Sequence, residues 1–378
     1  MSLTDLIRAE IAQRGPIPFR DFMERALYHP DHGYYSSGRA SIGRGGDFFT
    51  SVSVGALFGR LLARQFAEIW ERLERPRPFA IVEQGAHRGE FAHDVLSGLR
   101  EFAGECFAVV EHHLIEPSAA LAAAQRERLT EFAPQTFWHR NLDALPPIVG
   151  VHFSNELLDA FPVHLVKRSG SEWVERFIEW RDGEFAFIDD AITSPELRPL
   201  LATLPPLPDG YQTEINLAAL GWLDALGAKL ERGFVLAIDY GFSRDEYYRP
   251  ERTEGTLSAY AAHHRERDPL ARPGEIDLTA HVEFTSLAEH AIQGGFDLAG
   301  FTDQHHLIVG LSRLHFTDGA PTTTAAQKEL RALQTLMHPT LMGRSFKALC
   351  LGKGTGGVGS LAGFQFGGDA RVALGVQV

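Results

Sequence analysis

The chain has 378 residues, a formal charge of −13 and two cysteines. Its length suits one large α/β domain with additions, or two domains. The acidic balance and the absence of Lys/Arg clusters argue against nucleic acid or an anionic membrane surface as the main partner, and two isolated cysteines support neither a disulfide framework nor a metal site.

The first 75 residues are predicted to form a helical N-terminal extension around a glycine-rich loop. Apolar residues recur at helical spacing over residues 4–14, 18–28 and 53–74. Residues 1–10 have neither a secretory core nor an Arg-rich, acid-poor transit character, and no run of about 18 apolar residues predicts a membrane span. We therefore expect a cytoplasmic protein without a membrane span.

The glycine-rich loop spans residues 41–51 and reads Ser-Ile-Gly-Arg-Gly-Gly-Asp-Phe-Phe-Thr-Ser. Gly46 would let the backbone pass close to another group, and Asp47 would present a carboxylate there. Both are candidate cofactor contacts. The alternative is a simple helix cap at Thr50 or Ser51 ahead of the next helix.

A strand, a glycine turn and a helix are predicted next. The apolar run that begins at Phe79 ends on Glu83, turns through Gly85 and Gly89, and continues at helical spacing. The turn reads E-x-G-x-x-x-G and lacks the three glycines of a dinucleotide fingerprint. An acid ahead of the glycines suits S-adenosylmethionine (SAM), which carries an ammonium and a sulfonium, better than a pyrophosphate. An ordinary tight turn is the alternative.

Polar residues follow the next two strands. Glu116 ends the apolar run over residues 113–116, and an acid at the end of the second strand of a doubly wound sheet reaches the ribose hydroxyls of a nucleoside. A plain exposed strand end is the alternative. Asn141 lies where such folds often hold the adenine amine, but a loop-capping role is equally consistent with the sequence.

Asn155, Glu156 and Asp159 follow the predicted strand over residues 148–154. This position is the carboxyl edge of the sheet, beside the crevice where open α/β sheets bind ligands. Asn155 is a candidate cofactor contact. Two carboxylates three positions apart can converge on one cation or one proton, or merely complement the dipole of a helical turn. A cationic substrate would also fit the net charge, although an acidic balance serves solubility alone.

The remaining chain is divided by its residue patterns. Alternation over residues 163–210 predicts an inserted antiparallel meander, and the polar stretch 242–283 is too long for a simple connection and should be a functional excursion. A helix is predicted over residues 214–230.

Histidine pairs at 112, 263 and 305 lack metal-ligand spacing and are interpreted as packing or surface residues, so no metal site is expected. The predicted core comprises residues 76–162, 211–241 and 284–352, followed by a glycine-rich tail over 353–378.

Seven segments, in this order, carry a resemblance to a known family: Gly46-Asp-Phe-Phe-Thr-Ser51, Glu83-x-Gly-x-x-Arg-Gly89, Ser154-Asn-Glu-Leu-Leu-Asp-Ala-Phe-Pro162, Asp239-Tyr-Gly241, Gly255-Thr-Leu-x-Ala-Tyr260, Pro273-Gly-Glu-x-Asp-Leu-Thr-Ala-His281 and Met342-Gly-x-x-Phe-Lys-Ala-Leu349. They resemble the SAM-dependent methyltransferases that include the mitochondrial complex I assembly-factor enzyme. The resemblance implies a class I, Rossmann-like α/β fold with a seven-stranded sheet, a helical N-terminal extension and an inserted β-meander or cap. It also implies methyl transfer to an arginine nitrogen of a protein, with a respiratory-complex subunit as one candidate.

An arginine acceptor needs carboxylates that pair with its guanidinium, since its pKa is above about 12. Glu156 and Asp159 are the expected catalytic carboxylates, with Asp277 and His281 in second rank. The chain departs from the family pattern twice: Ala86-His87 replaces Pro-Gly in the glycine turn, and Val52-Ser53 replaces Pro-Glu after the glycine loop. Two alternatives therefore remain: a catalytically inactive assembly or scaffold protein, and a small-molecule methyltransferase.

Overall fold

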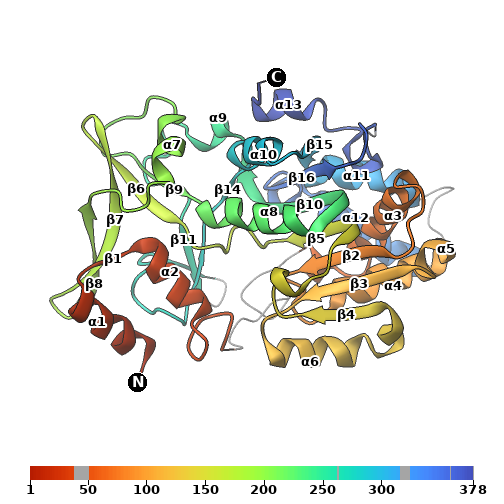
Figure 1. Ribbon diagram of the computed structural model, residues 1–378, viewed down its shortest axis with the longest axis horizontal. Coiled ribbons are helices and arrows are strands. Elements are labelled where there is room, and N and C mark those ends of the chain that lie inside the picture. The colour runs from red at the N-terminus through yellow and green to blue at the C-terminus, as the bar shows by residue number, and fades with distance from the viewer. Residues whose placement is uncertain (38–50, 262–263, 316–323, 358, 378) are drawn as a thin grey trace. The chain divides into compact units, whose positions relative to one another are not determined.

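The computed structural model describes residues 1–37, 51–261, 264–315, 324–357 and 359–377 (Figure 1). Gly46 and Asp47, the predicted cofactor contacts of the glycine loop, lie outside the described residues. The chain folds into two compact units. The first unit comprises Met1–Phe49, Leu158–Gly221 and Arg244–Ser286, and the second comprises Thr50–Leu157, Trp222–Ser243 and Leu287–Val378. The predicted N-terminal segment of 75 residues is therefore divided between the two units.

The second unit is built on one mixed sheet, with strand order β15-β16-β10-β5-β2-β3-β4. Neighbouring strands from β4 to β10 are parallel, while β16 pairs antiparallel with both β10 and β15. These seven strands belong to a sheet of eight and confirm the predicted α/β fold. The strands are β2 (Phe79–Gln84), β3 (Val110–Ile115), β4 (Thr136–His139), β5 (Ile148–Asn155), β10 (Leu230–Phe242), β15 (Asp297–Asp303) and β16 (Phe346–Lys353).

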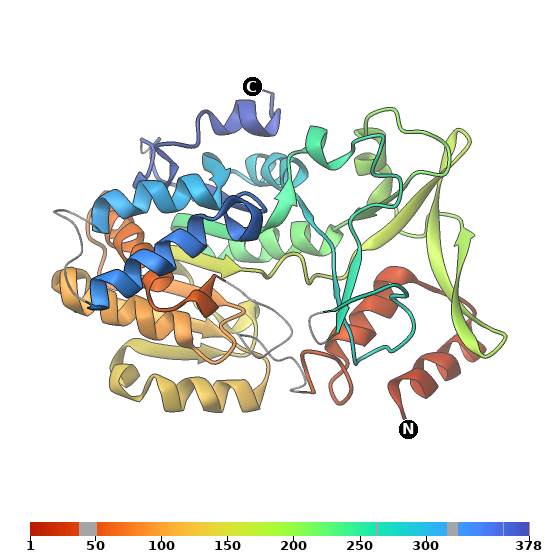
Figure 2. The ribbon, with the colours of Figure 1, turned by 180° about the vertical axis from the view of Figure 1, so that it is seen from behind.

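Helices cover this sheet, and its central strands are accordingly apolar along nearly their whole length. On one face, α3, α4, α11 and α12 pack together (Figure 2). Phe91 of α4 and Phe153 of β5 stack there with ring centroids 4.3 Å apart. The helices are α3 (Leu57–Arg72), α4 (Glu90–Phe102), α5 (Gly104–Phe107), α6 (Ala119–Arg128), α8 (Leu217–Lys229), α10 (Phe284–Gln293), α11 (Gln304–His315), α12 (Thr324–Met337) and α13 (Ala370–Leu374), of which α8 and α10 begin in segments of the first unit.

The first unit joins three separate segments of the chain around its own apolar core. Strands β6, β7 and β8 pair antiparallel in sequence order and confirm the predicted meander, which β1 and β9 extend. The excursion contributes a second sheet of order β12-β11-β13. The elements are α1 (Leu3–Arg14), α2 (Phe19–Tyr28), α7 (Leu197–Ala202), α9 (Arg244–Tyr247), β1 (Ile17–Pro18), β6 (His164–Ser169), β7 (Glu172–Arg181), β8 (Glu184–Asp190), β9 (Gln212–Ile215), β11 (Ser258–Ala261), β12 (His264–Glu266), β13 (Asp277–Thr279) and β14 (Val282–Glu283).

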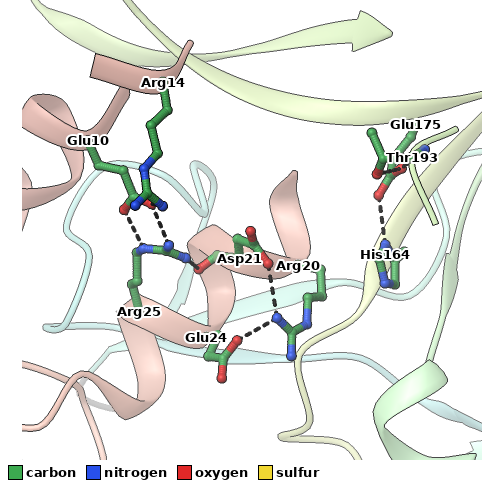
Figure 3. Close-up of polar contacts among 9 residues, drawn as sticks. All are labelled: Glu10, Arg14, Arg20, Asp21, Glu24, Arg25, His164, Glu175 and Thr193. Carbon is green, nitrogen blue, oxygen red and sulfur yellow. Dashed lines mark hydrogen bonds and ion pairs between the residues drawn. The ribbon is translucent and has the colours of Figure 1, made fainter. Parts of the chain in front are cut away.

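Polar side chains fix the elements of the first unit to one another (Figure 3). Arg25 of α2 donates two hydrogen bonds of 2.6 Å to the carboxylate of Glu10 in α1, a bidentate geometry. The fully buried carboxylate of Glu175 in β7 lies 2.7 Å from Nδ1 of His164 and accepts bonds from the amide and hydroxyl of Thr193. Burial alone would raise the pKa of Glu175, but these hydrogen bonds outweigh it and lower the pKa.

The excursion is organised by a buried carboxylate on β9, that of Glu214. It accepts hydrogen bonds from the backbone amides of Thr256 and Leu257 and from the hydroxyls of Tyr247 and Thr256. A Cβ atom on Gly255 would lie 2.2 Å from Oε1 of Glu214, and this glycine has a left-handed φ of 72°. The Gly-Thr-Leu motif of the excursion therefore wraps closely around one acid. The helix predicted over residues 214–230 begins only at Leu217, and Glu214 belongs to strand β9 instead.

His152 lies fully buried in the middle of β5, against the ring of Trp222 at a centroid distance of 5.3 Å. Neither of its ring nitrogens has a hydrogen-bond partner among the described residues. Burial consequently lowers the pKa of His152 from 6.5 to about 3. The imidazole is neutral in the folded protein throughout the physiological pH range.

Acid is expected to destabilise the second unit through this residue. Between pH 6.5 and about 3 the unfolded chain binds a proton at His152 that the folded chain does not, so stability falls as the pH falls through that window. At pH 4.5 the loss amounts to roughly 3 kcal/mol. His152→Leu should remove this part of the pH dependence, which urea unfolding at pH 7 and pH 4.5 would measure. An equal acid-induced loss in both proteins would contradict the assignment.

Candidate functional site

The predicted glycine turn follows β2 and leads into α4. Gly85 and Gly89 have φ angles of 80° and 81°, in the left-handed region that glycine adopts without strain. The amide of Gly89 donates to the carbonyl of Ala86 at 2.8 Å and closes the turn. His87 has a left-handed φ of 44° as well. The family's glycine is therefore replaced at a position where the backbone still takes a conformation that favours glycine.

Glu83, the acid ahead of the turn, is buried and paired with a histidine of the neighbouring strand. Oε2 of Glu83 lies 3.0 Å from Nε2 of His112, which is fully buried in β3. Nδ1 of His112 is buried without a hydrogen-bond partner among the described residues. A proton on Nε2 satisfies Glu83, whereas a proton on Nδ1 would be buried without an acceptor. His112, interpreted from the sequence as a packing or surface residue, thus orients the acid of the turn.

Glu116 lies directly after β3 with its carboxylate held on both sides. Its amide donates to the carbonyl of His139, Oε1 accepts from the amide of Ser118 at 2.8 Å, and Oε2 accepts from the side chain of Gln125 at 2.9 Å. Burial raises the pKa of Glu116, and these hydrogen bonds oppose the rise. Each oxygen retains capacity to accept a further hydrogen bond.

Asn141 and Ser51 differ in the contacts that their side chains make. Asn141 is exposed and caps the short turn Leu142–Ala144, since its Oδ1 accepts from the amide of Ala144 at 3.1 Å. The contact seen is thus the loop cap, one of the two roles expected. Ser51 is not the helix cap considered for the glycine loop: its hydroxyl donates to Gln304, and α3 begins only at Leu57.

The end of β5 carries the most unusual geometry of the site. Glu156 has a left-handed φ of 54°, and its amide donates to the carbonyl of Ile238 in β10 at 2.9 Å. Its Oε1 accepts from Nδ2 of Asn155 at 2.8 Å. Oδ1 of Asn155 is buried and accepts no hydrogen bond from the described residues. A strained acid beside an unsatisfied buried acceptor is the kind of arrangement that a binding site requires.

Asp239, at the end of β10, supports this position and was not among the predicted site residues. Its Oδ2 accepts from the amide of Leu157 at 3.1 Å, directly after Glu156, and its Oδ1 accepts from the amide of Tyr240. The Asp-Tyr-Gly motif thus holds the backbone that presents Glu156. The sequence signal was present, because a buried strand that ends on an acid recurs at Glu83 and Glu116.

The other predicted catalytic residues belong to the first unit. Asp159 and Asp277 are buried there, the carbonyl of Asp159 accepts from the amide of Ala280 at 2.9 Å, and Asp277 is hydrogen-bonded to the Tyr35 hydroxyl. Burial, followed by the nearby charge of Asp277, raises the pKa of Tyr35. Burial lowers the pKa of His281 to about 4. The structure therefore brings Asp277 and a tyrosine into contact, and His281 is neutral at pH 7.

No group of three or more His, Cys, Asp or Glu side chains among the described residues is arranged to hold a metal ion. No helix in that part of the chain is long and apolar enough to span a membrane.

A family model described as "Putative S-adenosyl-L-methionine-dependent methyltransferase" matches residues 61–302, more than half of the chain. The chain belongs to this family. The methyltransferase is 34% identical to a Burkholderia thailandensis protein solved with S-adenosyl-homocysteine bound, with a TM-score of 0.88 and coverage of 98% of this chain and 96% of that one. The residues of the second unit fit this cofactor, because the buried Oδ1 of Asn155 has no donor among the residues that the structure describes and the glycine turn permits close approach.

The chain is also similar to curated proteins from Drosophila melanogaster and human. The Drosophila melanogaster protein is 32% identical over 75% of this chain and 68% of its own length. The human protein is 27% identical over 90% of this chain and 81% of its own length. Both are named mitochondrial protein arginine methyltransferases, NDUFAF7 or its homologue. The prediction of a cytoplasmic methyltransferase is contradicted by these names and was wrong. The prediction rested on the lack of a recognisable targeting signal in residues 1–10, and the lack of a signal does not identify a compartment.

Proposed function

We propose that this methyltransferase transfers the methyl group of SAM to an arginine nitrogen of a protein substrate. The observation that carries the proposal is the carboxylate of Glu156, presented in a left-handed conformation at the carboxyl end of β5 and oriented by Asn155. The names of the Drosophila and human relatives support arginine as the acceptor. A net charge of −13 suits a cationic substrate. A respiratory-complex subunit is one candidate, as the family resemblance implies.

We assign the cofactor to the turn after β2 and to the ends of β3 and β5. Gly85 and Gly89 would allow the backbone to approach the ligand, and Glu83 would be oriented toward its cationic part by His112. Glu116 would accept hydrogen bonds from the ribose hydroxyls, and Oδ1 of Asn155 would accept one from an amine. Gly46, Asp47 and Asn141 remain predicted contacts.

When bound, SAM supplies an electrophilic methyl group on a sulfonium. Glu156 would pair with the guanidinium, align one nitrogen with that methyl and accept the proton that this nitrogen loses on transfer. The arginine cannot be deprotonated beforehand, because its pKa is above about 12. Catalysis would therefore come mainly from orientation.

Asp159 and Asp277 are proposed to hold cationic groups of the substrate, since both are buried carboxylates of the first unit. Tyr28 stacks on Tyr35 there at a centroid distance of 5.6 Å, and the two aromatic faces add affinity for cations. His281, with its pKa lowered to about 4, would act only as a neutral acceptor.

A scaffold protein that binds SAM without methyl transfer is the second candidate, and the left-handed His87 in the glycine turn favours it. Calorimetric titration with SAM should give a Kd between about 1 µM and 1 mM for the enzyme. Transfer of radiolabelled methyl to proteins of a lysate, followed by mass spectrometry of methylated arginine, then separates the two. Binding without any labelled product would identify a scaffold, label on another residue type would overturn the acceptor, and no binding would overturn the cofactor site.

A further inference from the structure

Gln125, on α6, is a fully buried glutamine that is hydrogen-bonded to two parts of the assigned cofactor site, the glycine turn and Glu116. Its Nε2 donates to the backbone carbonyl of His87 in the glycine turn at 2.8 Å and to Oε2 of Glu116 at 2.9 Å. Its Oε1 accepts from the indole N–H of Trp138, on β4, at 2.9 Å. One side chain therefore connects the turn after β2, the acid after β3 and strand β4.

The chemistry of these partners permits only one orientation of the amide. The indole of Trp138 is a donor without an acceptor, so it must face Oε1. The carbonyl of His87 and the ionised carboxylate of Glu116 are acceptors only, so both must face the two hydrogens of Nε2. Every polar atom of the amide is then satisfied, and a rotation by 180° would break all three hydrogen bonds.

Gln125 also lies beside the glycine turn. A Cβ atom on Gly89 would lie at ordinary van der Waals distance from it, 3.5 Å from Cγ and 3.6 Å from Cα. The bond to Glu116 is charge-assisted, the stronger class of hydrogen bond. Since Oε1 of Glu116 is already held by the amide of Ser118, Gln125 fixes the second oxygen.

We propose that Gln125 is a positioning residue. It fixes the carboxylate of Glu116, and with it the ribose of the cofactor, relative to the glycine turn. This inference rests on the proposed cofactor site. Gln125 acts through Glu116 and through the carbonyl of His87, and touches no reacting atom. The sequence offers no motif for it, because its three partners come from segments that only the fold brings together.

Gln125→Met tests the proposal, because methionine keeps the length of the side chain and loses its hydrogen bonds. The Kd for S-adenosyl-homocysteine, measured by calorimetry, should rise roughly tenfold, the effect of one lost charge-assisted bond. With Glu116→Ala already present, adding Gln125→Met should raise the Kd by less than about twofold, because the two residues act as a unit. The preference for S-adenosyl-homocysteine over its 2′-deoxyribose analogue should also shrink.

Gln65→Met is a matched control, since Gln65 is also fully buried in the second unit, bonded to Glu68 and to the amide of Gly363. It should lose comparable stability and keep its affinity for S-adenosyl-homocysteine. If Gln125→Met binds as tightly as the unaltered chain, or if its effect adds fully to that of Glu116→Ala, the positioning role is wrong. If the unaltered chain binds neither SAM nor S-adenosyl-homocysteine, the proposed function itself fails.

Discussion

Replacing Glu156 with glutamine is expected to lower kcat for methyl transfer by about 10²- to 10³-fold, the usual effect of losing a charged group that stabilises the reacting centre. Glutamine keeps the size of the side chain and its acceptor oxygen for Asn155, but it neither balances a guanidinium charge nor takes its proton. Affinity for S-adenosyl-homocysteine should change by less than about threefold. Single-turnover assays with radiolabelled SAM, together with calorimetry, measure the two quantities separately.

The left-handed backbone of Glu156 requires a control of its own. Asp182, in the turn between β7 and β8, has the same φ of 54° and also carries a carboxylate. Asp182→Asn should leave kcat and stability nearly unchanged, whereas Glu156→Asp should retain part of the activity because it keeps the charge. Normal turnover by Glu156→Gln would remove this residue from the mechanism, and a parallel loss of cofactor affinity would assign it to binding instead.

Glu214→Ala is expected to lower the free energy of unfolding by about 4 kcal/mol or more. Two amides and two hydroxyls around the excursion lose their shared acceptor, and each unsatisfied buried donor costs about 1–3 kcal/mol. For a domain of this size the loss corresponds to a Tm lower by roughly 8–16 °C. Differential scanning calorimetry would measure it.

The first unit offers graded comparisons for this prediction. Tyr247→Phe removes a single donor to Glu214 and should cost about 1 kcal/mol. Gly255→Ala places a methyl group against the carboxylate in a backbone conformation that favours glycine, and should approach the effect of Glu214→Ala. Glu196→Ala removes an exposed carboxylate of the same unit and should leave Tm nearly unchanged. A Glu214→Ala variant as stable as Glu196→Ala would show that the excursion does not depend on this acid.

Local patterns predicted more of the fold than of the site. The buried strands that end on Glu83, Glu116 and Asp239 and the glycine turn between Gly85 and Gly89 could be read from runs of a few residues, because parallel strands and tight turns restrict sequence locally. His112 and Gln125 could not. Each is an unremarkable residue on a strand or helix until its partner, distant in sequence, is known.

The sequence by itself determined the α/β class, the family and the residues that end the strands, since hydrophobic period, glycine placement and ordered motifs are properties of short segments. Only the tertiary structure decided that His87 and Glu156 take left-handed conformations, that residue 214 lies on a strand at the centre of the excursion's hydrogen bonds, and that Gln125 joins the glycine turn to Glu116. The physical reason is that these features depend on hydrogen bonds between segments far apart in the chain, and such bonds leave no periodic trace in the sequence.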